Sequence, residues 1–162
     1  GVASCRALRG AGAPRVQLVA CSPLTRSLQT AMEVFALPDA GLDLLALEAV
    51  REFNSSKYHP CDGRRRREEL DARFPYADFG GVTEGGDMLL GPGFVETPDI
   101  CDNRVHWFLG WLRMRPETSI ACVSHGAFVK RLLAHHLAPA GWDGPLRLQN
   151  LDCVEIPLAF LD

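Results

Sequence analysis

The sequence has no excess of charge of one sign, no long apolar run and no clustered cysteines. Its 17 Lys and Arg residues and 20 Asp and Glu residues give a net charge of -3 at pH 7, which provides no basic field for nucleic acid or a membrane surface. No apolar run approaches the roughly 18–20 residues of a membrane span, and residues 1–15 have no apolar signal core. These absences predict a protein that binds neither nucleic acid nor membranes.

The cysteines indicate a reduced compartment. They are dispersed without a C-x-x-C pair: Cys5, Cys21, Cys61, Cys101, Cys122 and Cys153. Neither cysteines nor histidines cluster at metal-ligand spacing, so we expect no zinc site. Three disulfides would be possible if the protein were secreted. Without a secretion signal, a reduced, cytoplasmic protein is the default expectation.

Length and composition indicate one ordinary globular domain. The chain has 162 residues, of which 47% are hydrophobic and 23% charged, enough for a single domain with a real core. It begins with Gly rather than Met, so either its start has been trimmed or it begins inside a longer protein. We expect a single domain over residues 1–162.

Residues 15–35 predict a strand followed by a helix. Residues 16–20 form the short apolar run of a strand buried in a parallel sheet. Ser22 and Pro23 suit a helix N-cap and a first helical position. Apolar residues then recur at helical spacing: Leu24, Leu28, Ala31, Met32 and Phe35. Arg26 is either an ordinary surface residue or a donor to phosphate at the carboxyl edge of the sheet.

The segment from Ser22 to Ala31, SPLTRSLQTA, resembles the SPL-x-R segment of the histidine phosphatase superfamily, also called the phosphoglycerate mutase-like family. The resemblance implies an α/β fold in which a histidine accepts a phosphoryl group. It also implies that Arg26 binds phosphate.

A second strand-to-helix unit contains His125. The apolar run 119–123 leads into Ser124-His125-Gly126, and a helix is expected over residues 127–137. Glycine after the histidine would permit a tight turn, and a histidine before a helix lies where anions bind. The alternative is a hydrogen-bonded core histidine. Because Ser-His-Gly in this context is similar to the superfamily's second histidine motif, the resemblance gives His125 the role of stabilising the transferring phosphoryl group.

Glu52 follows an apolar stretch, residues 42–50, that predicts a strand. At the end of that strand it resembles the acidic residue of the superfamily that protonates the leaving-group oxygen. The alternative is an exposed glutamate at a strand end. Its place after Arg26 in chain order favours the functional interpretation.

Residues 54–99 are rich in turn-forming residues and predict an insertion that covers the carboxyl edge of the sheet. Within it we expect a helix from Asp62 to Phe74. Three of the four residues after the run Arg64–Arg67 are acidic, which favours a solvated, internally paired helix face over a nucleic-acid patch. One arginine pointing inward to select an acidic substrate is a further alternative. The string CDGR at 61–64 is similar to the insertion of plant and fungal phosphoglycerate mutase-like proteins.

The last third of the chain predicts a helix and a strand. Thr97-Pro98-Asp99 has the residues of a helix start, and the helix is expected to end before Pro116, with Trp107 and Trp111 in the core. The last half of residues 146–156 alternates like a half-buried strand, and the segment resembles the Asn-containing strand that often follows the Ser-His-Gly helix in the superfamily.

One part of the superfamily pattern is lacking, the Arg-His-Gly tripeptide that supplies the nucleophilic histidine after the first strand. We therefore expect the chain to lack that strand and, taken literally, to be inactive or impaired. Truncation is favoured over a natural loss, because a lost central strand would expose the ladder groups of its neighbours.

The expected fold is a three-layer α/β/α sandwich with a mostly parallel sheet. The resemblance implies a phosphatase that acts on a small phosphorylated substrate through a phosphohistidine, with no metal or cofactor. Arg26 and His125 would bind phosphate and Glu52 would be the general acid. We favour a hydrolase over a mutase because no mutase signature surrounds Glu52. The alternative is a non-catalytic phosphate-binding scaffold, or a plain interaction module if Arg26 and His125 lie far apart; substrate and oligomeric state stay open.

Overall fold

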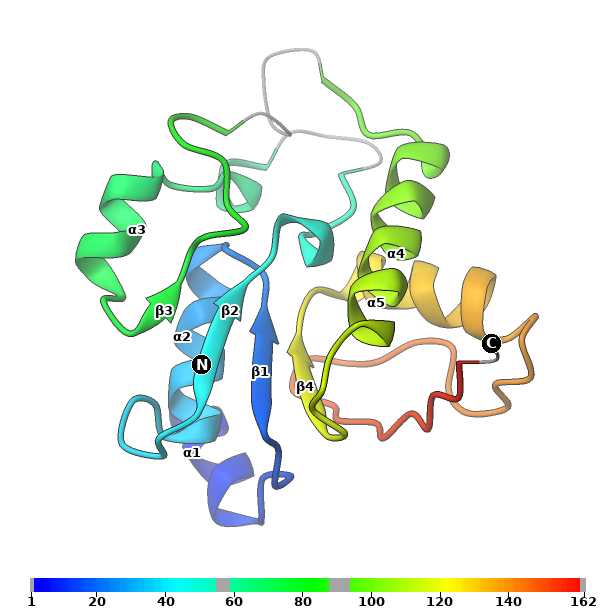
Figure 1. Cartoon of the computed structure of the whole chain (residues 1–162), viewed down its shortest axis with the longest axis horizontal. Coiled ribbons are helices and arrows are strands. Elements are labelled where there is room, and N and C mark those ends of the chain that lie inside the picture. The colour runs from blue at the N-terminus through cyan, green and yellow to red at the C-terminus, as the bar shows by residue number, and fades with distance from the viewer. Residues whose placement is uncertain (1, 55–58, 88–93, 161–162) are drawn as a thin grey trace.

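A parallel sheet forms the centre of the computed structural model, which describes residues 2–54, 59–87 and 94–160 (Figure 1). Its strands are β1 (Leu18–Cys21), β2 (Asp43–Ala46), β3 (Ala77–Asp78) and β4 (Ile120–Val123), in the spatial order β3-β2-β1-β4. Leu18 lies opposite Asp43 on one side and opposite Ile120 on the other. The expected α/β fold, with a parallel sheet flanked by helices, is confirmed.

Helices cover both faces of this sheet, because successive residues of β1 point to opposite sides. Val19 and Cys21 pack in one core with α2 (Thr25–Phe35) and α3 (Arg67–Arg73). Ala20 packs in a second core with α4 (Pro98–Arg113) and α5 (Gly126–Arg131). The first helix, α1 (Val2–Gly10), packs against α2.

The helix after β1 has the predicted apolar stripe but a different start. Leu28, Ala31 and Val34 are buried on one face of α2. The residue before its first turn is Leu24, in extended conformation and without a side-chain cap. Ser22 is therefore not the N-cap: its Oγ accepts a hydrogen bond from the Leu24 amide at 3.3 Å and lies beside the histidine of the second unit.

The prediction for α4 is confirmed at its start and wrong for one tryptophan. Thr97 Oγ1 accepts a hydrogen bond from the Ile100 amide at 3.4 Å, as an N-cap does. The buried side of α4 contains Val105 and Phe108. Trp107 precedes Phe108 by one residue, a rotation of about 100°, and is 53% exposed.

The predicted strand over residues 42–50 is shorter than expected. The Leu47 amide donates to Cys21 O at 2.8 Å, and the chain then enters a 3-10 turn, η1 (Glu48–Val50). Ala49 and Val50 are apolar because they pack in the second core with α4. Glu52 therefore follows this turn instead of ending a strand.

Two further boundaries differ from the predictions. The helix expected from Asp62 begins at Arg67, because Asp62 ends a separate 3-10 turn, η2 (Pro60–Asp62), with partners elsewhere in the fold. No strand forms over residues 146–156, which lie within the described ranges. Leu148 and Ile156 instead pack against the second core, so their alternation reflects packing without a ladder partner.

The helix expected over residues 127–137 forms as α5, continued by a π-helical turn, η3 (Leu132–Leu137). Residues 54–99 contribute β3 to the sheet as well as loops, while 55–58 and 88–93 lie outside the described residues. That residues 54–99 cover the carboxyl edge of the sheet, and that the chain lacks the superfamily's first strand, both stay predictions. Over the described ranges, no helix is long and apolar enough to cross a membrane, and the six cysteines are free thiols.

Candidate phosphate site

The site lies where β1 and β4 end, at the carboxyl edge of the sheet. Arg26 comes from the first turn of α2, and His125 immediately precedes α5. Their side chains meet, with Arg26 Nη2 at 3.0 Å from His125 Nδ1. Two residues 99 positions apart thus share one location, so the interaction-module alternative, which required them to lie far apart, loses its support.

His125 is buried and hydrogen-bonded on both ring nitrogens. It is 7% exposed, and its Nε2 lies at 2.8 Å from Ser22 Oγ and at 3.1 Å from Ser27 Oγ. Burial, with a smaller effect from the Arg26 guanidinium, lowers its pKa to about 3. A guanidinium can only donate, so Nδ1 accepts from Arg26 and the proton of the neutral ring lies on Nε2.

This tautomer decides what Ser22 can do. A serine nucleophile needs a base that accepts its proton, but the Nε2 facing Ser22 already carries one. Ser22 is also fully buried. The Ser22–His125 contact therefore positions the ring and does not activate the serine.

The tight turn expected between strand and helix forms over Ser124 and His125, between β4 and α5, but it does not use the conformational freedom of Gly126. Its φ lies outside the left-handed region, and a Cβ at this position would meet no atom within 4 Å. The backbone here consequently does not require glycine.

Glu52 lies across the first turn of α5. Its Oε1 accepts hydrogen bonds from the amides of Phe53 at 3.0 Å, Ala127 at 3.1 Å and Phe128 at 3.3 Å. Burial raises its pKa, and these amide bonds and the Arg26 charge oppose the shift. The carboxyl is thus next to the His125 segment, with a proton affinity shifted in the direction that suits an acid.

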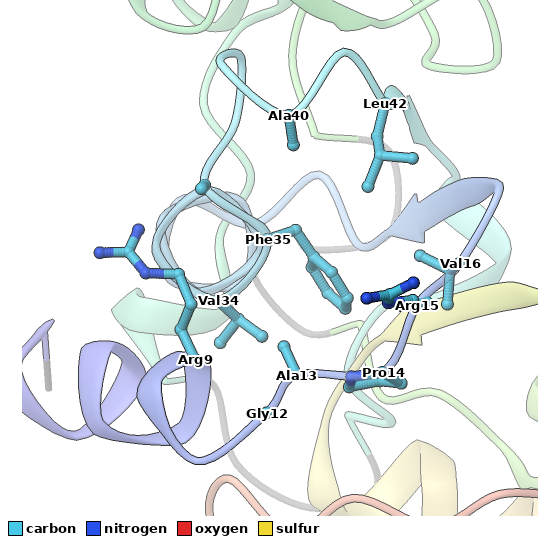
Figure 2. Close-up of a pocket in the computed structure, with 11 residues that line it drawn as sticks. Arg9, Gly12, Ala13, Pro14, Arg15, Val16, Val34, Phe35, Ala40 and Leu42 are labelled. Atoms are coloured by element: carbon cyan, nitrogen blue, oxygen red, sulfur yellow. The ribbon is translucent and has the colours of Figure 1, made fainter.

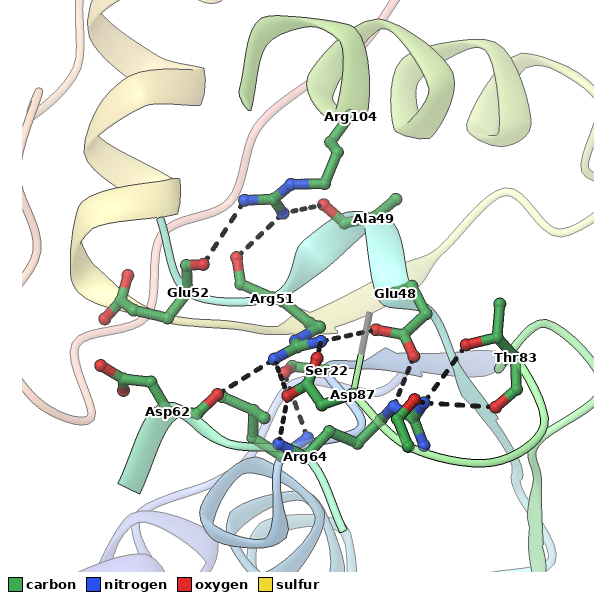
Figure 3. A network of polar contacts seen from close by, with 12 residues as sticks. Ser22, Glu48, Ala49, Arg51, Glu52, Asp62, Arg64, Thr83, Asp87 and Arg104 are labelled. Carbon is green, nitrogen blue, oxygen red and sulfur yellow. Dashed lines mark hydrogen bonds and ion pairs between the residues drawn. The ribbon is translucent and has the colours of Figure 1, made fainter. Parts of the chain in front are cut away.

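Arg51, which no sequence pattern selects, connects the loops around the site (Figure 3). It is 4% exposed and donates to both carboxylate oxygens of Asp87 at 2.6 Å. Arg64 pairs with Glu48 at 2.6 Å, and Arg51 contacts the same carboxylate at 3.2 Å. These paired charges fasten residues 48–51, 62–64 and 87 to one another.

The run Arg64–Arg67 has an exposed, internally paired part, as one alternative predicted, and one arginine that points inward. Arg65 and Arg66 pair with Glu69 and Glu68 at 3.2 Å on an exposed face. Arg64 points inward, but its partners are Glu48, the Thr83 side chain and backbone carbonyls. It is a structural residue and not free to select a substrate.

Arg104 on α4 fixes the backbone that precedes Glu52, as Figure 3 shows. It donates to the carbonyl oxygens of Ala49 at 2.6 Å, Arg51 at 3.1 Å and Glu52 at 3.4 Å. It also forms a two-pronged ion pair with Glu96 at 2.7 and 2.9 Å. A single helix residue thereby sets the position of the expected general acid. In the sequence, this role of Arg104 is indicated only by the position of an arginine on the apolar side of α4.

The remaining contacts of Arg26 are with the turn η2. Its Nη2 lies at 2.8 Å from Asp62 Oδ1, and its Nη1 donates to Cys61 O. The carbonyl of Asp62 accepts from Arg51 at 3.0 Å. A carboxylate from the chain itself thus occupies the guanidinium.

A separate, widely open surface pocket of about 500 Å³ lies at the opposite, amino edge of the sheet (Figure 2). It is lined largely by apolar side chains, among them Val16, Phe35 and Leu42, and by Arg15. None of Arg26, Glu52 or His125 contributes to it. Among the residues that the structure describes, no group of three or more His, Cys, Asp or Glu residues is placed to hold a metal ion.

The structure is that of an α/β protein with Arg26 and His125 side by side at the carboxyl edge of its parallel sheet, the edge where open α/β sheets bind ligands. A model of the histidine phosphatase superfamily (branch 1) matches residues 1–156. The chain therefore belongs to the histidine phosphatase superfamily.

Relatives from Arabidopsis thaliana show which members of the superfamily this chain is similar to. The chain is 32% identical over 146 residues to a phosphoglycerate mutase-like protein, covering 74% of this chain and 53% of that one. It is 32% identical over 140 residues to phosphoglycerate mutase-like protein 1, covering 71% and 49%. The sequence-based assignment to the phosphoglycerate mutase-like proteins, with plant relatives, is confirmed. The chain spans about half the length of these relatives.

A solved structure supports the fold alone. The ecdysone phosphate phosphatase from Bombix mori, in complex with tungstate, aligns with a TM-score of 0.54 at 14% sequence identity. The alignment covers 96% of this chain and 61% of that one.

Proposed function

We propose that this chain forms the phosphate-binding part of a phosphomonoester hydrolase of the phosphoglycerate mutase-like type, acting on a small phosphorylated substrate through a phosphohistidine. The observation that carries the proposal is the contact of Arg26 with His125 at the carboxyl ends of β1 and β4. A transferring phosphoryl group spreads charge over three equatorial oxygens, so fixed donors are the main catalytic resource. Arg26 is such a donor.

Glu52 and His125 take the other roles. The raised pKa of Glu52 suits a general acid that gives its proton to the leaving oxygen. His125 is neutral in this structure and positions Arg26. A bound phosphate dianion would favour the charged ring, which would place a second N–H on Nδ1 and let His125 donate to the phosphate.

A non-catalytic phosphate binder is the second candidate, and a specific observation favours it. Both ring nitrogens of His125 are engaged by neighbouring side chains. Neither it nor Ser22 is activated as a nucleophile here. For both candidate functions we propose a cytoplasmic location, which rests on the dispersed cysteines and on the sequence-based expectation of no secretion signal.

The test combines binding and turnover. We would measure stabilisation of the chain by orthophosphate and by vanadate in thermal unfolding, and hydrolysis of an aryl phosphate. Arg26→Ala should remove the stabilisation, while Arg66→Ala, which changes an exposed arginine, should preserve it. Turnover that depends on Arg26 and His125 supports the hydrolase, and Arg26-dependent binding without turnover supports the binder. Binding that Arg26→Ala leaves unchanged contradicts both.

A further inference from the structure

Arg26 is occupied in this structure by an anion from its own chain. The Asp62 carboxylate lies at 2.8 Å from Nη2, and the Cys61 carbonyl accepts from Nη1. A carboxylate and a phosphate present similar oxygen acceptors to a guanidinium. A phosphate that binds Arg26 through Nη2, on the side where His125 lies, therefore has to take the place of Asp62.

The Arg26–Asp62 pair is exposed enough to exchange. The Arg26 side chain is 39% exposed and that of Asp62 12%, whereas the Arg51–Asp87 pair is at 4% and 9%. Ion pairs in contact with solvent contribute little, but breaking a buried pair leaves an uncompensated charge in the interior. Of these two pairs, the one at Arg26 can open without disturbing the fold.

The backbone around Asp62 can stay in place when its carboxylate leaves. Its carbonyl is held by Arg51 at 3.0 Å, and its amide donates to His59 O at 2.8 Å. Rotation of the Asp62 side chain is thus sufficient to free Nη2. The charge of the displaced carboxylate remains close to the site and repels an incoming anion.

We propose that Asp62 is an internal competitor of the phosphate group and thereby a specificity-determining residue. Its carboxylate sets a threshold that a dianionic phosphate monoester overcomes and a monoanionic carboxylate does not. This inference rests on the proposed function, since it requires phosphate to bind at Arg26. It adds a selection by ligand charge that Arg26 and His125 alone do not provide.

The test compares the affinities of Asp62→Asn and the wild-type chain for orthophosphate and for acetate, each measured by isothermal titration calorimetry. Asparagine keeps the size of the side chain and its acceptor oxygen but removes the charge. We expect orthophosphate to bind about three- to tenfold more tightly to Asp62→Asn, and acetate binding to become measurable. Asp71→Asn is the matched control, because it removes an exposed carboxylate paired with Arg67 in α3 and should leave both affinities at wild-type values.

A double variant separates the two proposals. In Arg26→Ala/Asp62→Asn the tighter binding should disappear. If Arg26→Ala weakens phosphate binding but Asp62→Asn does not tighten it, the competitor role is overturned and the phosphate site stands. If Asp62→Asn weakens binding, Asp62 holds the ligand instead of competing with it. If neither chain binds phosphate, or if Arg26→Ala changes nothing, both proposals fail.

Discussion

The pH dependence of stability gives a direct measure of the burial of His125. The pKa of its side chain falls from 6.5 to about 3 on folding, first through burial and then through the Arg26 charge. The folded chain therefore binds fewer protons at this residue than the unfolded chain does. The contribution of the neutral, buried His125 to the free energy of unfolding is present in full above the ordinary histidine pKa. It is lost as the pH falls toward the pKa of the folded state.

The magnitude follows from the two pKa values. Between pH 7 and pH 5 the unfolded histidine becomes protonated while the folded one stays neutral, which lowers the free energy of unfolding by about 2 kcal/mol. Other titrating groups add their own effects. The difference between the wild type and His125→Gln isolates this residue, because glutamine keeps hydrogen-bonding capacity and does not titrate.

Urea unfolding at a series of pH values is the assay. The wild type should lose about 2 kcal/mol more than His125→Gln between pH 7 and pH 5, although the variant starts from a lower stability. His135→Gln, which changes an exposed histidine, should follow the wild type. An NMR titration of the His125 ring gives an independent value if the variant is too unstable to measure. Equal losses in the wild type and His125→Gln, or a ring that titrates near its ordinary value, would refute the reasoning.

The other predictions concern the framework of the site and the cores. Arg104→Met should lower the free energy of unfolding by about 3–5 kcal/mol, because it leaves the buried Glu96 carboxylate unpaired; urea unfolding measures this, and a cost under about 1 kcal/mol would contradict it. Phe128→Ala, at a fully buried position, should cost about 3–5 kcal/mol, whereas Met114→Ala, at 85% exposure, should stay within about 0.5 kcal/mol of the wild type. Native-state alkylation with mass spectrometry should label the exposed Cys61 before the buried Cys101, since burial also raises the pKa of the Cys101 thiol to about 11; equal rates would show that the second core opens readily.

Local patterns predicted the elements that local physics determines. The apolar run of β1 and the stripe of α2 follow from burial periodicity, and Thr97 caps α4 as its sequence indicates. The two strand predictions failed for one cause, which is that apolar residues can be buried without forming the expected element. Val50 is buried in a 3-10 turn and Ile156 packs against the second core in an irregular segment.

The candidate site divides in the same way. Arg26 and His125 could be selected because each lies in a motif, and Glu52 because of its place after Arg26 in chain order; the structure brings Arg26 and His125 into contact. Their catalytic and binding roles stay predictions. Arg51 and Arg104 could not be selected, since their importance depends on carboxylates 36 and 8 positions away and on carbonyls that only the fold brings near. Sequence periodicity contains no information on such pairings.

The burial of the four arginines near the site also decides which substitutions are informative. Side chains of Arg51, Arg64 and Arg104 are at most 11% exposed and paired with carboxylates, while that of Arg26 is 39% exposed. Removing Arg51, Arg64 or Arg104 leaves an unpaired carboxylate in the interior and shifts the loops. A loss of phosphate binding in such a variant would therefore report on folding as much as on chemistry. Removing Arg26 leaves Asp62 without its cation and Nδ1 of His125 without its donor, but the Arg26 side chain itself is partly exposed, so the cost is smaller than for the other three. A loss of phosphate binding on removal of Arg26, in a chain that stays folded, is therefore the result that assigns the site.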